Sequence, residues 1–292
     1  MYEKLDHCPA CGHTLFKNRI ICQDHAASKE SFALVECAKC TLVFTNPRPD
    51  EQNIGKYYQH ENYISHTNKA NNLTNTLYKI IRNYTLSQKL SIVKRFSTKK
   101  RILDYGCGPG VFANKMIQSN YEVTGFEPSE EVDHSEYSNK IKFIKSFEAL
   151  QKENKFDIIT AWHVIEHVHR LKPTIKSLRK LLESDGLFII AVPNINSYDA
   201  EHYKEKWAAY DVPRHLYHFS QTSINSLLIK NKFELLETLP MKFDSFYVSL
   251  LSEKYSNSNG SLLKAFKTGL QSNRKAKSTG EYSSLIYVYQ KK

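Results

Sequence analysis

Three glycines follow one carboxylate about a third of the way along this 292-residue chain, and together they could bind a small ligand. Asp104 is followed, at spacings of two, by Gly106, Gly108 and Gly110. Glycine accepts positive φ and lets a ligand approach the backbone closely. A helix that begins behind such a turn favours polar or anionic groups at its N-terminus. The run predicts a ligand-binding turn between a buried strand at 102–105 and a helix that begins near Val111.

The spacing of these glycines distinguishes two classes of nucleotide ligand. Dinucleotide-binding turns follow the pattern G-x-G-x-x-G, but here the third glycine comes one residue early and Val111 occupies its place. The carboxylate of Asp104 would repel a pyrophosphate, whereas it would attract an ammonium group. S-adenosylmethionine (SAM) carries an ammonium and a sulfonium and has no phosphate. We therefore expect SAM in this turn, beside the backbone of Cys107 and its glycine neighbours.

A second carboxylate stands where the ribose of an adenosyl ligand would be recognised. Glu127 comes 23 residues after Asp104, at the end of the next predicted strand, and Pro128 fixes the following turn. A carboxylate at that position can accept hydrogen bonds from both ribose hydroxyls. The alternative is an ordinary solvated loop acid. Further along, Ser146 and Phe147 are candidates to flank the adenine.

A histidine-rich block follows the predicted strand 156–161. Trp162 and His163 are expected beside the cofactor, whereas Glu166 and His167 would face an acceptor. Histidine titrates near neutrality, so a His–Glu pair there could remove a proton from a hydroxyl or a carbon acid. The alternative is a buried helix start in which His167 is packed and hydrogen-bonded.

Four of the six cysteines form two closely spaced pairs. No apolar run that could serve as a secretion signal begins the chain, so we expect a reducing compartment and no disulfides. Each pair has the Cys-x-x-Cys spacing that aims two thiolates at one metal, and 25 residues separate the pairs. Four thiolates with no open position predict structural zinc rather than unliganded thiols. The expected ligands are Cys8, Cys11, Cys37 and Cys40, with His13, Cys22 and His25 as spare candidates.

The elements that position these groups alternate between strand and helix from about residue 99. Such alternation predicts an α/β fold with a doubly wound, mostly parallel, seven-stranded Rossmann-like sheet, whose ligands bind at the carboxyl ends of the strands. A small zinc ribbon would precede it. The expected strands are 102–105, 121–126, 141–144, 156–161, 187–192, 233–238 and 284–290.

Changes in pattern divide the chain into three parts. Residues 1–48 are expected to form the zinc-ribbon module, 49–98 a helical linker at the substrate entrance, and 99–292 the SAM-binding domain. The linker holds a long helical pattern from 71 to 96. Three aromatic residues ahead of this helix are open candidates for lining the entrance: Tyr57, Tyr58 and Tyr63.

Residues 194–219 carry ten aromatic, His, Asp or Arg side chains after the fifth predicted strand. Long loops of this kind are often functional lids, so we expect a segment that closes over an acceptor. Arg214 could hold an acidic acceptor in bidentate fashion. His215 and His218 compete with His167 for the role of base. The alternative is that these side chains pack a satellite cluster.

The net charge of +11 is unevenly distributed. Residues 254–280 contain six Lys or Arg and no acidic residue, which predicts a solvated loop or a contact with an anion or nucleic acid. This stretch is the best candidate for disorder or a mobile excursion.

The longest apolar run, 187–192, is too short to span a bilayer. We expect a soluble, cytoplasmic protein whose partner is a small-molecule acceptor and not a membrane.

These motifs together resemble those of the class I SAM-dependent methyltransferases. Within that superfamily, the block from His163 to Val168 is similar to that of ubiquinone-type O-methyltransferases, where acidic residues and a histidine are associated with a divalent metal; His163 replaces an acidic residue of that block. The zinc module resembles that of sugar C-methyltransferases, and residues 211–220 resemble a motif of methyltransferases found among cell-surface glycan genes. The matching motifs are 104–110, Glu127, 156–169 and 186–193.

The resemblance implies an enzyme that methylates oxygen or carbon of a sugar, quinone or polyketide-like metabolite. A zinc ribbon with a basic SAM fold also occurs in RNA methyltransferases, which form the first alternative. Against it, no Asn-Pro-Pro-Tyr-type motif follows the fourth strand. The second alternative is a non-catalytic protein that keeps zinc and SAM only for interaction or structure.

Overall fold

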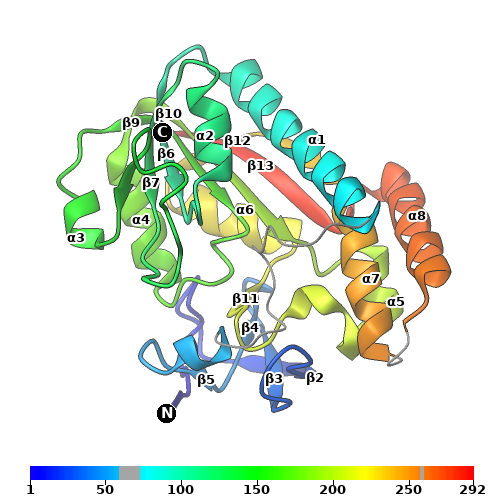
Figure 1. Ribbon diagram of the computed structural model, residues 1–292. Helices are drawn as coiled ribbons and strands as arrows, with labels where there is room; N and C mark the ends of the chain where they lie inside the picture. The colour runs from blue at the N-terminus through cyan, green and yellow to red at the C-terminus, as the bar shows by residue number, and fades with distance from the viewer. Residues whose placement is uncertain (59–72, 257–259) are drawn as a thin grey trace.

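A seven-stranded sheet forms the centre of the molecule (Figure 1). The computed structural model describes residues 1–58, 73–256 and 260–292. The sheet confirms the predicted doubly wound, mostly parallel α/β fold, because only β13 runs against its neighbours. In spatial order the strands are β12 (Phe233–Pro240), β13 (Ser284–Lys291), β10 (Leu182–Pro193), β9 (Phe156–Trp162), β6 (Arg101–Tyr105), β7 (Glu122–Phe126) and β8 (Lys142–Ile144).

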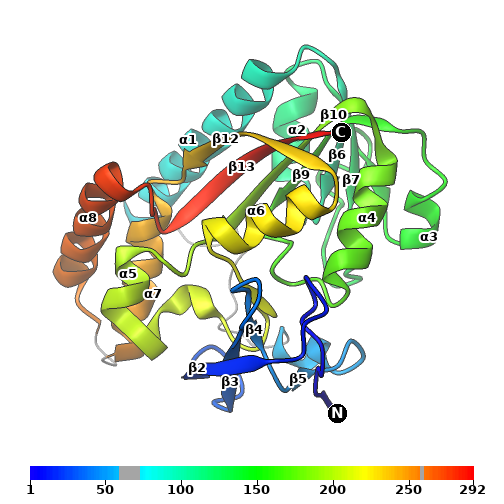
Figure 2. The ribbon, with the colours of Figure 1, turned by 180° about the vertical axis from the view of Figure 1, so that it is seen from behind.

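Helices cover both faces of this sheet, as Figures 1 and 2 show from opposite sides. On one face, α1 (Leu73–Phe96) and α2 (Val111–Ile117) pack on the apolar side chains of the central strands. On the other face lie α4 (Leu171–Leu181) and α6 (Gln221–Lys230), together with the short α3 (Phe147–Leu150). The central strands are buried on both sides, which explains their almost continuous apolar sequence.

The N-terminal module is a small antiparallel sheet below the main one. Its strands β2 (Phe16–Gln23) and β3 (Ser31–Cys37) pair with each other, and β4 (Val43–Thr45) pairs with β3. Two further strands, β1 (Tyr2–Glu3) and β5 (Arg48–Pro49), pair with each other. A short 3-10 helix, η1 (Ile54–Tyr57), leads out of the module. Tyr63, one of the aromatic candidates of the linker, lies outside the described residues.

Residues 194–219, where a long loop acting as a lid was expected, contain regular secondary structure. The segment folds as α5 (Tyr198–Tyr203), η2 (Lys204–Lys206), η3 (Ala208–Tyr210) and β11 (Tyr217–His218). Strand β11 pairs with β4, so the segment completes the N-terminal module as a fourth strand. The side chain of Trp207 is only 1% exposed and donates to Asp199 at 2.8 Å. Most of the segment's aromatic side chains are buried, which matches the alternative of a packed cluster.

The basic stretch 254–280 is mostly helical rather than disordered. It contains the end of α7 (Asp244–Ser256) and all of α8 (Leu262–Thr279). Helix α8 begins at Ser261, whose side chain accepts from the backbone of Lys264, and ends at Gly280 in the left-handed conformation. In both views α8 lies at the outer edge of the molecule, beside α7. Among the described residues, no helix is long and apolar enough to cross a membrane.

Candidate functional site

The glycine turn behind β6 is closed tightly against its neighbours. Gly106, Gly108 and Gly110 all have positive φ, of +73°, +53° and +93°. The backbone nitrogen of Gly106 donates to the carbonyl oxygen of Phe126 on β7 at 2.7 Å. A Cβ at Gly106 would lie 2.4 Å from Cγ2 of Val164. Only glycine therefore fits the first position of the turn, and α2 begins directly behind it as predicted.

Asp104 and Glu127 stand at the carboxyl ends of adjacent strands. Asp104 is buried and accepts a hydrogen bond from the Thr160 hydroxyl at 2.7 Å. Burial raises the pKa of Asp104 to about 6, against the opposing effects of Thr160 and the nearby Lys89. Glu127 accepts the backbone N–H of Gly108 at 3.0 Å. Both predicted acids therefore flank the turn.

The other residues predicted around a cofactor border the same strand ends. Cys107 lies in the turn, and its Sγ would be 2.7 Å from a Cβ at Gly125 on β7. Pro128 is exposed after Glu127. Ser146 caps α3, and the ring of Phe147 lies edge-on to that of Phe126, with centroids 6.1 Å apart.

Lys89 on α1 is a site residue that the sequence analysis missed. Its Nζ lies 4.5 Å from the centroid of the Trp162 ring, a cation–π contact at the end of β9. Burial lowers the pKa of Lys89 to about 8, while Asp244 and Asp104 raise it. The helical spacing could have indicated this position. Residue 89 follows Leu86 by three residues, and Leu86 lies on the side of the helix that faces the sheet.

His163 lies between two carboxylates. Its Nε2 is 3.2 Å from Oδ2 of Asp244, the first residue of α7, and its Nδ1 is 3.3 Å from Oε1 of Glu166. Burial opposes its charge, but the two carboxylates outweigh burial and raise the pKa of His163 to about 9. The ring is therefore cationic near neutral pH. Asp244 was also missed, because it comes from a helix far away in the sequence.

Glu166 and two histidines form the polar centre of the site. The Glu166 side chain is fully buried; its Oε1 pairs with the His163 ring at 3.3 Å, whereas Oε2 has no hydrogen-bond partner among the described residues. One carboxylate oxygen of Glu166 and one ring nitrogen each of His167 and His215 lie within 4.8 Å of one another. Buried carboxylates normally have their hydrogen bonds satisfied. This group is therefore a candidate for binding a ligand or a cation, or for accepting a proton.

Backbone carbonyls orient both histidine rings. Nδ1 of His167 lies 3.1 Å from the carbonyl oxygen of Arg214, and Nδ1 of His215 lies 2.8 Å from that of Ala209. A carbonyl only accepts, so each Nδ1 carries a proton, and a neutral His167 ring has its lone pair on Nε2. The Tyr58 hydroxyl lies 3.0 Å from Nδ1 of His167. Burial, reinforced by His215, lowers the pKa of His167 to about 4, so this ring is neutral at neutral pH.

Arg214 does not have the role that the sequence predicted. Its guanidinium is 1% exposed, and Nη2 lies 2.6 Å from Asp211 and 3.1 Å from Asp24. Nη1 donates to the carbonyl oxygen of Tyr57 at 2.9 Å. These partners tie residues 194–219 to the N-terminal module. The expectation that Arg214 holds an acidic acceptor is therefore corrected, since the guanidinium is already engaged in a structural network.

His218 is also separated from the polar centre. Its Nε2 lies 3.2 Å from the Thr45 hydroxyl, within the β11–β4 pair. Of the three histidines that competed for the role of base, the structure therefore brings only His167 and His215 to Glu166.

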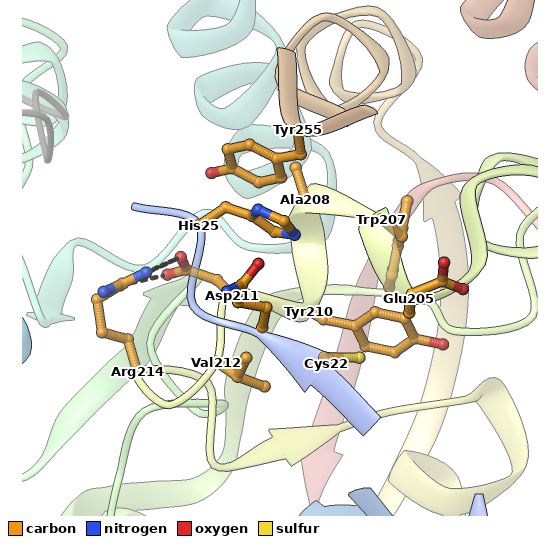
Figure 3. A pocket seen from close by; sticks show the side chains of 11 residues that line it. Cys22, His25, Glu205, Trp207, Ala208, Tyr210, Asp211, Val212, Arg214 and Tyr255 are labelled. Atoms are coloured by element: carbon orange, nitrogen blue, oxygen red, sulfur yellow. Dashed lines mark hydrogen bonds and ion pairs between the residues drawn. The ribbon is translucent and has the colours of Figure 1, made fainter. Parts of the chain in front are cut away.

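A small pocket with a cavity volume of about 10 Å³ lies between β2, residues 204–214 and α7 (Figure 3). The rings of His25 and Tyr255 stack at its edge, with centroids 4.6 Å apart. The Asp211–Arg214 ion pair forms one wall, as Figure 3 shows. Asp211 also lies 3.9 Å from Nε2 of His215. The pocket and the histidine cluster therefore share this wall.

The four paired cysteines converge in the N-terminal module. Sγ of Cys8 lies 3.5 Å from Sγ of Cys40, and Sγ of Cys11 lies 3.6 Å from Sγ of Cys37. All four sulfur atoms lie within 4.8 Å of one another. Tetrahedral zinc with Zn–S bonds of about 2.3 Å needs sulfur atoms about 3.8 Å apart. Cys22, a spare candidate, is not part of this group.

Comparison with known families decides the classification. The methyltransferase-domain family matches residues 78–238, which is more than half of the chain. This protein belongs to the class I SAM-dependent methyltransferases. The match begins in α1 and runs through the glycine turn, both strand-end acids and the histidine block.

Several relatives of this methyltransferase are ubiquinone biosynthesis O-methyltransferases. The protein from Pelagibacter ubique is 30% identical over 121 residues, which are 36% of this chain and 50% of the relative. The protein from Vibrio cholerae O395 is 32% identical over 110 residues, which are 34% of this chain and 45% of the relative. The chain spans about half the length of these curated relatives.

Solved structures share the fold of this methyltransferase. Magnesium protoporphyrin IX methyltransferase of Synechocystis PCC 6803, solved with bound SAM, has a TM-score of 0.52 at 14% sequence identity. The alignment covers 85% of this chain and all of that one. At this identity the likeness concerns the fold alone.

Proposed function

We propose that this protein transfers a methyl group from SAM to an oxygen or carbon atom of a small metabolite such as a sugar, a quinone or a polyketide-like ring. The observation that carries the proposal is the polar centre at the end of β9. There one oxygen of the buried Glu166 carboxylate lies within 4.8 Å of a ring nitrogen of His167 and of one of His215, two residues after Val164, which packs against Gly106 of the glycine turn. Such a group can receive a proton from an acceptor.

The residues around the turn fit SAM in shape and charge. Glycine at position 106 lets the turn pack directly against Val164, and the positive φ values of the three glycines hold the backbone of the turn at the carboxyl end of β6, where SAM would bind. Asp104 would face the amino group, and Glu127 would accept the ribose hydroxyls. The indole nitrogen of Trp162 is buried without a hydrogen-bond partner among the described residues, which leaves a donor for a ligand. SAM supplies an electrophilic methyl group on its sulfonium.

Lys89 supports this orientation of the cofactor. Its ammonium group lies over Trp162 and close to Asp104, which would bind the amino group of the same methionine moiety. An amino acid ligand needs a cation for its carboxylate as well as an anion for its ammonium group. We therefore assign the carboxylate of SAM to Lys89.

We assign the role of base to His167. Its Nδ1–H is held by the carbonyl oxygen of Arg214, and its pKa of about 4 keeps the ring neutral near pH 7. The Nε2 lone pair is then free to take a proton from the acceptor, and the carboxylate of Glu166 would stabilise the imidazolium formed. The backbone nitrogen of His167 donates to the carbonyl oxygen of Val164 at 3.0 Å, and its ring contacts the carbonyl oxygen of Arg214, so the ring needs no large movement to act.

The same three side chains also fit a divalent cation. Glu166, His167 and His215 offer one carboxylate and two imidazoles, and each Nδ1–H is oriented by a backbone carbonyl, as is usual for metal-bound histidines. A cation held there would lower the pKa of an acceptor hydroxyl. This agrees with the metal implied by the resemblance to the ubiquinone-type block, although His163 pairs with Asp244 instead.

We propose that the four cysteines hold one structural zinc ion. The donor set is closed, since four sulfur atoms leave no position for a substrate. The distances between the sulfur atoms are already close to those that zinc requires. Zinc in this module would stabilise the fold and take no part in the transfer.

An oxygen acceptor has the stronger support. The relatives that match the central part of the chain are named O-methyltransferases. Deprotonating a hydroxyl requires one positioned base, which His167 can provide.

A labelled-methyl screen tests the proposed function. The purified protein is incubated with methyl-labelled SAM and with sugar nucleotides, phenols or RNA, and the products are identified by mass spectrometry. Label in a sugar or phenol supports the proposal. Label only in RNA, with an RNA affinity that falls steeply with salt, would identify an RNA methyltransferase instead. Absence of turnover with every acceptor, despite SAM binding, would favour the non-catalytic alternative.

Replacing Glu127 by alanine should weaken SAM binding. The carboxylate would lose two charge-assisted hydrogen bonds to the ribose, which corresponds to about 2–4 kcal/mol. Isothermal titration calorimetry measures the affinity directly. The matched control is Glu130→Ala, which removes an exposed carboxylate three residues further on that pairs with Lys145. Unchanged SAM affinity in Glu127→Ala, or a parent protein that prefers NAD, would contradict the assignment.

A further inference from the structure

Helix α8 carries a row of exposed apolar side chains that the methyl-transfer site does not use. The exposed fractions are 72% for Leu262, 84% for Leu263, 60% for Phe266 and 54% for Leu270. We call these four residues the α8 ridge. Single exposed apolar residues are common on proteins, but a contiguous group on one helix usually marks an interaction surface.

Most of the contact that holds α8 in place comes from a neighbouring side of the helix. That side packs against α7 and α5 and is made of small buried residues, while Phe266 of the ridge adds a ring contact with Phe246 of α7 at 5.4 Å between centroids. The packing is close, since a Cβ at Gly269 would lie 2.7 Å from Cδ1 of Phe246. The inner residues are Ala265, Thr268, Gly269, Ser272 and Ala276. The three leucines of the ridge, and the part of the Phe266 ring that does not contact Phe246, are therefore exposed to solvent on an anchored helix.

Positive charge accompanies the ridge. Five Lys or Arg side chains of α8 are exposed, and the helix contains no acidic residue. With about 100° of rotation per residue, the ridge occupies one sector of the helix, and Lys267 and Arg274 lie along its solvent-facing border. The five basic residues are Lys264, Lys267, Arg274, Lys275 and Lys277.

The exposed apolar side chains and the positive charge of α8 together favour one kind of partner. A second copy of the helix would bring like charges together, which disfavours a symmetric contact. Nucleic acid would match the charge but would leave Leu263 and Phe266 against a phosphate backbone. An anionic lipid surface satisfies both features, because apolar side chains enter the acyl boundary while lysines contact the headgroups.

We propose that α8 docks this protein on an anionic lipid bilayer, lying in the plane of the interface. The contact is interfacial, in keeping with the absence of a spanning helix among the described residues. It revises the expectation that the protein has no membrane partner. The inference does not depend on the proposed methyl transfer, because α8 lies outside the polar centre.

Vesicle co-sedimentation of the full chain tests this proposal. The probes are vesicles of phosphatidylcholine with phosphatidylglycerol, and vesicles of phosphatidylcholine alone. We expect binding to the anionic vesicles that weakens as salt increases, and little binding to the neutral ones. The variant Leu263→Ser/Phe266→Ser should reduce binding at least about tenfold, and Lys267→Glu/Arg274→Glu should abolish the preference for anionic lipid.

A matched control removes exposed apolar residues elsewhere. Ile229→Ser/Leu236→Ser changes side chains that are 57% and 42% exposed on α6 and β12, and it should bind vesicles like the parent. Circular dichroism and thermal melting confirm that each variant is folded. A parent that does not bind anionic vesicles, or a ridge variant that binds as well as the parent, overturns the proposal. A parent dimer in light scattering that the ridge variant converts to monomer would assign the ridge to a second copy instead.

Discussion

Replacing Cys8 and Cys37 by serine is expected to release one equivalent of zinc and to destabilise the whole protein. The two substitutions remove one ligand from each pair, and serine is a poor zinc ligand at neutral pH. The parent should contain close to one zinc per chain by metal analysis. Because binding of structural zinc contributes on the order of 10 kcal/mol in isolated zinc fingers, even partial loss is large on the scale of protein stability.

The destabilisation should extend beyond the N-terminal module. Strand β4 of that module pairs with β11, and the buried Arg48 donates to the Tyr217 hydroxyl at 2.9 Å. A loss of about 4 kcal/mol would lower the melting temperature by roughly 10 °C. The control is Cys22→Ser, which removes a buried thiol outside the four-cysteine group and should retain the zinc. Full zinc content in the Cys8/Cys37 variant would disprove the assigned ligands.

Replacing His167 by glutamine should lower turnover by about 10²–10⁴-fold while leaving SAM affinity nearly constant. Glutamine keeps a polar side chain of similar length but cannot accept the proton. SAM affinity should persist, because the proposed cofactor contacts come from Asp104, Glu127 and the glycine turn. Turnover is measured with the best acceptor from the labelled screen, and calorimetry reports the affinity for SAM.

The pH dependence provides a second test of His167. A base acts in its unprotonated form, which predominates above its pKa. Because the pKa of His167 is lowered to about 4, kcat at saturating SAM should be almost flat between pH 6 and 8 and should fall as the pH decreases towards 4. SAM affinity, measured separately, should change within that range, because the pKa of Asp104 is raised to about 6 and that of Lys89 is lowered to about 8. A base with an ordinary histidine pKa would instead lose activity between pH 7 and 6.

Two further variants locate the base. His218→Gln changes a buried histidine that contacts Thr45 instead of Glu166, and it should keep turnover within a few-fold of the parent. His215→Gln should raise the acceptor's KM more than it lowers kcat. Near-normal turnover of His167→Gln across pH 6–8 would transfer the role to His215, or would show that the transfer needs no base.

The elements that could be predicted from the sequence are those whose local residue pattern matches the way they pack in the fold. The glycine turn, its preceding strand and α2 were expected from Asp104 to Val111, because positive φ and buried strands leave strong local signals. All seven strands of the main sheet were expected, since apolar runs alternate with amphipathic helices. The convergence of Asp104, Glu127 and Glu166 at one edge follows from the parallel topology.

The failures involve side chains whose partners are distant in the sequence. The guanidinium of Arg214 is a group that commonly binds anionic ligands. One of its two carboxylate partners, Asp24, lies 190 residues away in the sequence. The 194–219 segment carries few regular apolar repeats, so its strand β11 could not be anticipated without β4. Helix α8 is polar and lysine-rich, and its inner face consists of small residues that hydropathy does not register.

The pairing of β11 with β4 constrains how the chain folds during synthesis and where it can be divided into fragments. The N-terminal sheet is incomplete until residues 217 and 218 have left the ribosome, so its fourth strand has to arrive after most of the central sheet has been synthesised. Contacts of such long range slow folding. A fragment that ends before residue 217 would expose the edge of β4, and exposed edges invite pairing with other chains. A chimera that exchanges the N-terminal module between related enzymes would therefore have to carry β11 with it.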